Sequence, residues 1–209
     1  MDSISPENAE LLCNVRSFRF FYDNDAWIGV ARHRIDSLRR YLPLLPRLQS
    51  LGLNSIFLGP DVPQKIGLFS AFQQTLSSLS LAYCRTTSNA LITIINYFPL
   101  LLNLDLQALA YEEDRVPVPQ LSRPLRGRLV ITDCGAHDQA LFDKLSNPSP
   151  ELDELILRQV HMPIFYDCFV GVHGWSVKHL EMRSGVSEHE RMSQNHQNFA
   201  ILIRHIHLQ

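Results

Sequence analysis

Pairs of apolar residues separated by one position recur along the chain at a nearly constant interval. In the stretch LSSLSLAYCRTTSNALITIINYFPLLLNLDL, from Leu76 to Leu106, the phrase LSSLSL is followed by the similar phrase LLNLDL. The pairing recurs seven times: Phe18 with Phe20, Leu51 with Leu53, Leu79 with Leu81, Leu104 with Leu106, Leu129 with Ile131, Leu155 with Leu157, and Leu180 with Met182. First members 18, 51, 79, 104, 129, 155 and 180 are 33, 28, 25, 25, 26 and 25 residues apart. Units of this length cannot close a core alone, so neighbours must stack and share one apolar interior.

Each pair predicts a short strand with one buried face, because alternate side chains of a strand point to the same side. We call the paired residues the anchors. Another apolar residue precedes most first anchors by three positions, at Val15, Leu48, Leu76, Leu101, Leu152 and Val177. In the fifth unit Arg126 occupies this position and interrupts the pattern.

Segments between the anchors predict what covers the strands. Leu91, Ile94, Ile95 and Phe98 have the spacing of one helix face, with Ser88 or Asn89 as the cap and Pro99 as the end. A second helix is expected to bury Leu141, Phe142 and Leu145, with Asp138 as its cap and Pro148 and Pro150 as stops.

Two connections between strands differ from this pattern of one short covering helix. In the first interval, a longer covering helix is indicated by Ile35, Leu38, Leu42 and Leu45. Between the fourth and fifth units Pro117, Pro119 and Pro124 exclude a regular helix, so an extended strut is expected there.

The LxxLxL phrase, with Cys84 and Cys134 three residues after the second anchor and a polar cap soon afterwards, resembles the cysteine-containing class of leucine-rich repeats. It is most similar to the repeat regions of fungal F-box and leucine-rich-repeat proteins, which the phrase PVPQLSRPLRGRLVITDC also resembles. The resemblance implies an α/β leucine-rich-repeat solenoid of about seven irregular repeats. Its curved parallel sheet would line the concave face, with helices and loops on the convex face. We assign this domain to residues 1–185 and a C-terminal tail or capping segment to residues 186–209.

In that group, the repeats hold the substrate of a ubiquitin ligase, and an N-terminal F-box docks on the Skp adaptor of the cullin complex. The first repeat here begins by Leu12, so we expect no F-box and no Skp or cullin binding unless an F-box is supplied elsewhere. The resemblance therefore implies a protein-interaction module that binds a protein partner, rather than an enzyme. A free-standing scaffold or inhibitor unconnected with ubiquitination is the alternative, and a hydrolase with a cryptic site is a third possibility from another class.

Composition and charge limit the kinds of partner and compartment that we expect for this chain. A formal charge of -2 gives no bulk attraction to nucleic acid or acidic membranes, so we expect neither as a partner. The N-terminus lacks a signal-peptide pattern, and no stretch reaches about 18 uninterrupted apolar residues, which favours a cytoplasmic or nuclear protein. The basic clusters RHRIDSLRR and RPLRGR have acidic neighbours, so we interpret them as solvated faces rather than phosphate sites.

Sites for chemistry are not indicated. The four cysteines are far apart, and the tail histidines His189, His196, His205 and His207 lack carboxylates at ligand spacing, so no metal site or cofactor is expected. No nucleophile-elbow, phosphate-loop or H-E-x-x-H motif occurs, so no catalytic residue is assigned. In the tail, Phe199, Leu202, Ile203 and Ile206 suit a covering helix, or Ile201 and Ile203 begin another strand.

Residues flanking the anchors should form three outward rows across stacked strands. The rows are Ser17, Ser50, Ser78, Asn103, Arg128, Glu154, His179; Arg19, Gly52, Ser80, Asp105, Val130, Ile156, Glu181; and Phe21, Asn54, Ala82, Gln107, Thr132, Arg158, Arg183. Such a face is polar whether it is merely solvated or binds a partner. As a protein-binding surface it would have Val130 and Ile156 as an apolar centre within a charged rim. The candidate residues are Asp105, Arg128, Val130, Glu154, Ile156, Arg158, His179, Glu181 and Arg183.

Overall fold

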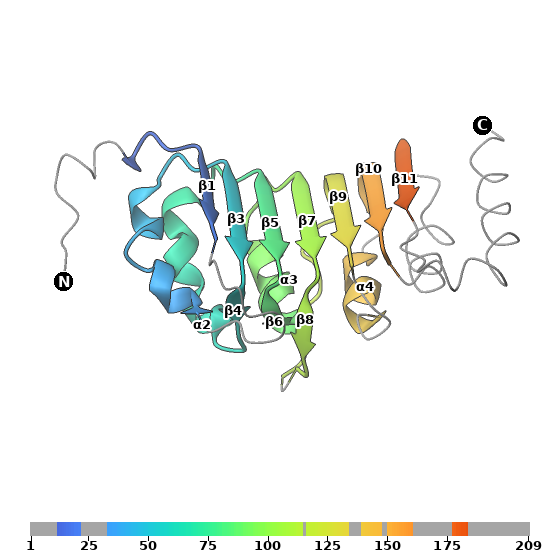
Figure 1. Ribbon diagram of the computed structural model, residues 1–209, viewed down its shortest axis with the longest axis horizontal. Coiled ribbons are helices and arrows are strands. Elements are labelled where there is room, and N and C mark those ends of the chain that lie inside the picture. The colour runs from blue at the N-terminus through green and yellow to red at the C-terminus, as the bar shows by residue number, and fades with distance from the viewer. Residues whose placement is uncertain are drawn as a thin grey trace, which may run out of the picture.

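The computed structural model shows an α/β protein built on a seven-stranded parallel sheet. It describes residues 12–21, 33–114, 116–133, 139–147, 150–160 and 177–183. The strands are β1 (Ser17–Phe20), β3 (Ser50–Asn54), β5 (Ser78–Ala82), β7 (Asn103–Gln107), β9 (Arg126–Thr132), β10 (Glu151–Arg158) and β11 (His179–Arg183). They lie side by side in chain order, each parallel to the next (Figure 1).

The register of this sheet confirms the seven predicted strands. Successive first anchors are directly opposite one another, from Phe18 through Leu51, Leu79, Leu104, Leu129 and Leu155 to Leu180. In β3 and β5 both anchors are buried, whereas the residues between and beside them are partly exposed. Spacing in the sequence therefore determines which face of each strand is buried, because strand side chains alternate.

A second parallel sheet runs beside the first and has no counterpart in the sequence predictions. Its strands, in spatial order, are β2 (His33–Arg34), β4 (Ile56–Leu58), β6 (Arg85–Thr87) and β8 (Ala110–Glu112). Figure 1 shows β4, β6 and β8 continuing below the strands of the larger sheet. Strands of two or three residues carry too little alternation to be recognised from sequence.

The residue that follows each strand of the larger sheet from β3 to β10 has the same conformation. In the described part of the chain, five residues other than glycine have positive φ, between 46° and 57°: Ser55, Tyr83, Ala108, Asp133 and Gln159. Each follows the last residue of a long strand and donates its backbone N–H to a carbonyl at the end of the next strand, at 2.8–3.0 Å. We call these residues the corners. Because the donor belongs to the backbone, side chains as different as serine and tyrosine are accommodated.

Helix α3 (Ser88–Tyr97) covers the anchor face near the middle of the sheet, and its predicted apolar face is confirmed as buried. The predicted cap was wrong. Thr87 is the N-cap, and its side chain accepts the Ala90 N–H at 3.1 Å. Asn89 serves another purpose, because its side-chain amide donates to the Pro117 carbonyl at 3.1 Å. The helix ends before Pro99, as predicted.

The other predicted connections have mixed outcomes. Helix α4 (Gln139–Leu145) buries Leu141, Phe142 and Leu145 as expected. The longer helix expected in the first interval is wrong, since the chain forms 3-10 segments η1 (Ile35–Leu38) and η2 (Leu42–Leu44). Its four apolar residues are nevertheless buried. The spacings of 35 to 38 and 42 to 45 equal one 3-10 turn, and Pro43 lacks the N–H that a continuing helix would require.

A proline-rich strut follows β8, as predicted. Described residues 113–114 and 116–125 contain no helix or strand, and side chains of α3 hold this segment in place. The Asn96 amide donates to the Gln120 carbonyl at 2.9 Å and accepts the Ser122 N–H at 2.8 Å. These bonds satisfy individual backbone groups of the strut and attach it to the helix, although it has no secondary structure of its own.

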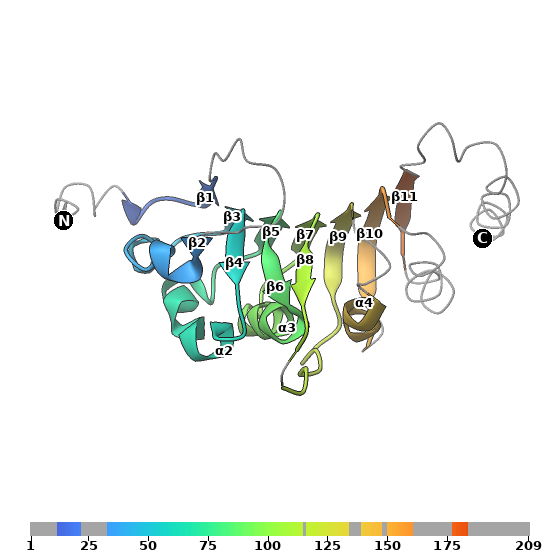
Figure 2. The same ribbon diagram turned by 60° about the horizontal axis from the view of Figure 1, so that its bottom comes forward.

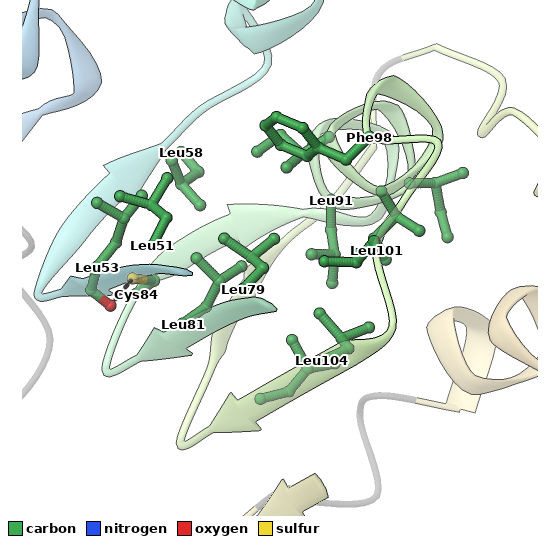
Figure 3. Packing of buried hydrophobic residues seen from close by; sticks show 14 of the residues in the cluster. Leu51, Leu53, Leu58, Leu79, Leu81, Cys84, Leu91, Phe98, Leu101 and Leu104 are labelled. Carbon is green, nitrogen blue, oxygen red and sulfur yellow. Dashed lines mark hydrogen bonds between the residues drawn. The ribbon is translucent and has the colours of Figure 1, made fainter. Parts of the chain in front are cut away.

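All of these elements enclose one apolar core on the anchor face. Helix α2 (Val62–Lys65), 3-10 segment η3 (Ile66–Phe72), α3 and α4 follow one another along the same side of the larger sheet (Figure 2). The rings of Phe69, Phe72 and Phe98 meet with centroids 5.7–6.0 Å apart. Figure 3 shows leucine anchors of successive strands pointing to the inner face of α3.

The chain beside Arg126 is irregular in two respects. Gly127 has a φ of +72°, and a Cβ there would lie 2.4 Å from the Leu102 carbonyl oxygen. In β10 the register shifts between Leu152 and Glu154, which leaves Asp153 as an extra residue.

Several predictions lie outside the described residues: the tail 186–209 with its histidines and its helix or strand, Cys134, Cys168, Asp138 and Pro148.

Candidate interaction surface

The face of the seven-stranded sheet opposite the anchors carries the three predicted rows, and we call it the strand face. The paired register places Ser50, Ser78, Asn103, Arg128, Glu154 and His179 directly opposite their neighbours, and the other rows align in the same way. The described helices pack on the anchor side, because their apolar residues share one cluster with the anchors. The candidate residues are therefore brought onto one surface, although they are far apart in the sequence.

Charges at the β9–β11 end of the strand face are paired with one another. Arg128 Nε lies 2.6 Å from Glu154 Oε2, and Arg158 donates to Glu181 Oε1 from Nε at 3.2 Å and from a terminal nitrogen at 3.1 Å. Arg183 Nε lies 2.8 Å from the same Glu181 oxygen, and His179 Nε2 lies 4.0 Å from Glu154 Oε1. Partly exposed pairs of this kind contribute about 0–1 kcal/mol each. Their main effect is to satisfy these charges within the chain.

The predicted apolar centre is not exposed. Val130 and Ile156 are opposite each other in the register, as expected, but they are only 3% and 2% exposed. They lie outside the main core cluster, with the Arg128–Glu154 pair before them on the same face and Arg158 after Ile156. Long charged side chains cover neighbouring apolar groups with their aliphatic stems. The interpretation of Val130 and Ile156 as an open contact centre was therefore wrong.

The middle of the strand face is different, because no described cationic side chain forms a direct ion pair with Asp105, although three arginines act on it from farther away. Among the described residues, Asp105 makes no hydrogen bond or ion pair, in contrast to Glu154 and Glu181. Burial raises the pKa of the Asp105 carboxyl, and the positive charges of Arg128, Arg158 and Arg19 partly oppose this. A half-buried carboxylate without a direct partner is unfavourable for the folded chain.

The row that contains Asp105 has small residues on the next two strands toward β1. Ser80 and Gly52 occupy the two neighbouring positions, and Arg19 ends the row. The stem of Arg19 lies over Gly52, because a Cβ on that glycine would be 3.0 Å from Arg19 Cγ. With strands spaced about 4.8 Å apart, the Cα atoms of Arg19 and Asp105 are separated by roughly 14 Å. Ser80 thus leaves room beside the carboxylate, and the stem of Arg19 covers the next position.

An aromatic side chain that the sequence analysis missed stands at the edge of this region. Tyr83, the corner after β5, is 55% exposed, and its hydroxyl accepts the Gln107 side-chain amide at 3.3 Å. Gln107 is the next outward residue after Asp105 in β7, so the phenol lies close to the carboxylate's strand. Strand alternation could not predict that Tyr83 lies on this face, because the direction of a side chain after the end of a strand depends on the turn conformation. Only the corner conformation would have shown it.

Cys84 is structural rather than reactive. It is fully buried, and its Sγ donates to the Leu53 carbonyl at 3.4 Å (Figure 3). Desolvation raises the pKa of this thiol to about 11, so it stays protonated at neutral pH. Within the described ranges, no group of three or more His, Cys, Asp or Glu side chains is arranged to hold a metal ion.

Comparisons of the chain with protein-family models, with curated proteins and with solved structures found no match. Among the described helices, none is both long enough and apolar enough to cross a membrane.

Proposed function

We propose that the chain is a non-enzymatic protein-interaction module, a leucine-rich-repeat solenoid whose strand face is the concave binding surface. The supporting observation is the register of the outward rows, which assembles polar and charged residues from strands about 25 residues apart into one surface. The opposite face is committed to the core. A surface of this kind recognises a polypeptide by shape and charge complementarity.

The proposal extends to the class that the sequence resembles, the substrate-recognition repeats of F-box ubiquitin-ligase receptors. The repeated anchors and the buried Cys84 at its turn position support the repeat part of this resemblance. The ubiquitin connection rests on the sequence phrases alone. In a pull-down with a purified Skp-type adaptor, the repeats by themselves are expected not to bind, because that role belongs to the F-box; binding would contradict this division of roles.

Affinity capture with the purified chain, followed by identification and purification of the captured protein, tests the binding function. The partner's binding is then measured with Ser80→Arg, which places a long side chain on the strand face without touching the anchors. Asn147→Arg, an exposed position after α4, is the matched control. Binding should be lost in the first variant and kept in the second. The proposal would be refuted if the bound partner protected only the helices from hydrogen exchange and the Ser80→Arg variant still bound it normally.

A further inference from the structure

Some charged side chains of the strand face form ion pairs within the chain and others do not. This difference indicates where a partner is recognised. At the β9–β11 end, Glu154 and Glu181 are each held by arginines of the chain. In the middle, Asp105 has no such bond among the described residues. A charge that costs the folded state stability and lies on an open surface is typical of a functional position. The complementary group is a cation.

The surroundings of Asp105 suit a long basic side chain. Ser80, directly opposite Asp105 on β5, is small and leaves the carboxylate accessible on that side, whereas Gly52 beyond it is covered by the stem of Arg19. The exposed ring of Tyr83 stands at the neighbouring strand end, fixed by its bond to Gln107. A carboxylate and an exposed aromatic ring carried by neighbouring strands are a favourable combination for an ammonium or guanidinium group.

We propose that Asp105 and Tyr83 together receive a lysine or arginine side chain from a bound polypeptide. This inference rests on the proposed function and specifies the chemistry of its partner. Asp105 forms the ion pair, Tyr83 contacts the cation or its stem, and the paired charges of β9–β11 border the site. Arg19, at the far end of the row, disfavours a second cation and favours an acidic group at that position.

Selection of random linear peptides displayed on phage, with the purified chain as bait, tests the inference. The selected peptides should share one basic position. Synthetic copies are then titrated by fluorescence polarisation, with the basic residue present or replaced by citrulline or norleucine. Removing either the basic residue or the charge of Asp105, in Asp105→Asn, should weaken binding about tenfold. The two changes together should cost little more than one alone, because they remove the same contact.

Two further variants keep the test independent of folding. Tyr83→Asn removes the ring but retains a residue that tolerates positive φ, and it should weaken binding about two- to fivefold. Glu113→Gln, an equal charge change at an exposed position after β8, should leave binding unchanged.

The outcomes separate this inference from the proposed function. Peptides that bind the strand face without a shared basic residue, or with equal affinity for Asp105→Asn, would overturn the inference alone. Self-association of the chain that disappears in Asp105→Asn would assign the position to a second copy and also overturn it. Failure of every peptide, together with Ser80→Arg binding the captured protein normally, would reject the binding function of the face itself.

Discussion

Replacing Ala108 by glycine should stabilise the protein. Ala108 is the corner after β7, with a φ of 46°, and its backbone N–H donates to the Thr132 carbonyl at 2.9 Å. The left-handed conformation costs a residue with a Cβ about 1–2 kcal/mol, and glycine avoids this cost. Glycine in turn gives the unfolded chain more freedom, which removes about 0.4–1 kcal/mol. Because the hydrogen bond belongs to the backbone, the net expectation is a gain of about 0.5–1 kcal/mol.

Thermal unfolding followed by circular dichroism measures this gain. For a chain of 209 residues, each kcal/mol shifts Tm by about 2–4 °C, so Ala108→Gly should raise Tm by about 1–4 °C. Ala110→Gly is the matched control, two positions later in β8 and outside the set of residues with positive φ. It carries the entropic cost without relieving strain and should lose about 0.5–1 kcal/mol. Equal destabilisation of both variants would refute the explanation of the corners.

Three other substitutions and measurements follow from the same structure. Gly127→Ala should lose at least about 2 kcal/mol in urea unfolding, because it adds a Cβ at positive φ against the Leu102 carbonyl; unchanged stability would contradict this geometry. At pH 8 a thiol reagent should label partly exposed Cys13 but not Cys84 in the folded chain, as read by peptide mass spectrometry, because the pKa of Cys84 is about 11; rapid labelling of Cys84 would show that it is not buried. Asp105→Asn should raise Tm at pH 7, because folding raises the pKa of this carboxyl and its charged form therefore destabilises the folded state. The gain in Tm should vanish as pH falls below the unfolded pKa, where the carboxyl is protonated in both states. A gain that grows toward low pH would contradict the raised pKa.

Much of the candidate surface could be predicted once the anchors were found. The outward rows follow from the anchors by alternation, so Asp105, Arg128 and Glu154 were assigned to the correct face and register. Alternation does not give exposure, however. Val130 and Asp105 are adjacent in the same row, yet one is covered by neighbours and the other is only half-buried.

The sequence by itself determined the seven strands, their order of pairing and the face each one buries. It could do so because anchor spacing is a local property, and each unit must bury its own anchors against the next. Only the tertiary structure decided the corners, the second sheet and the pairing of charges. Tyr83 shows the reason: its conformation is held by a carbonyl of the next strand, and its hydroxyl by Gln107, 24 residues later. Such contacts depend on neighbours that the local sequence does not contain.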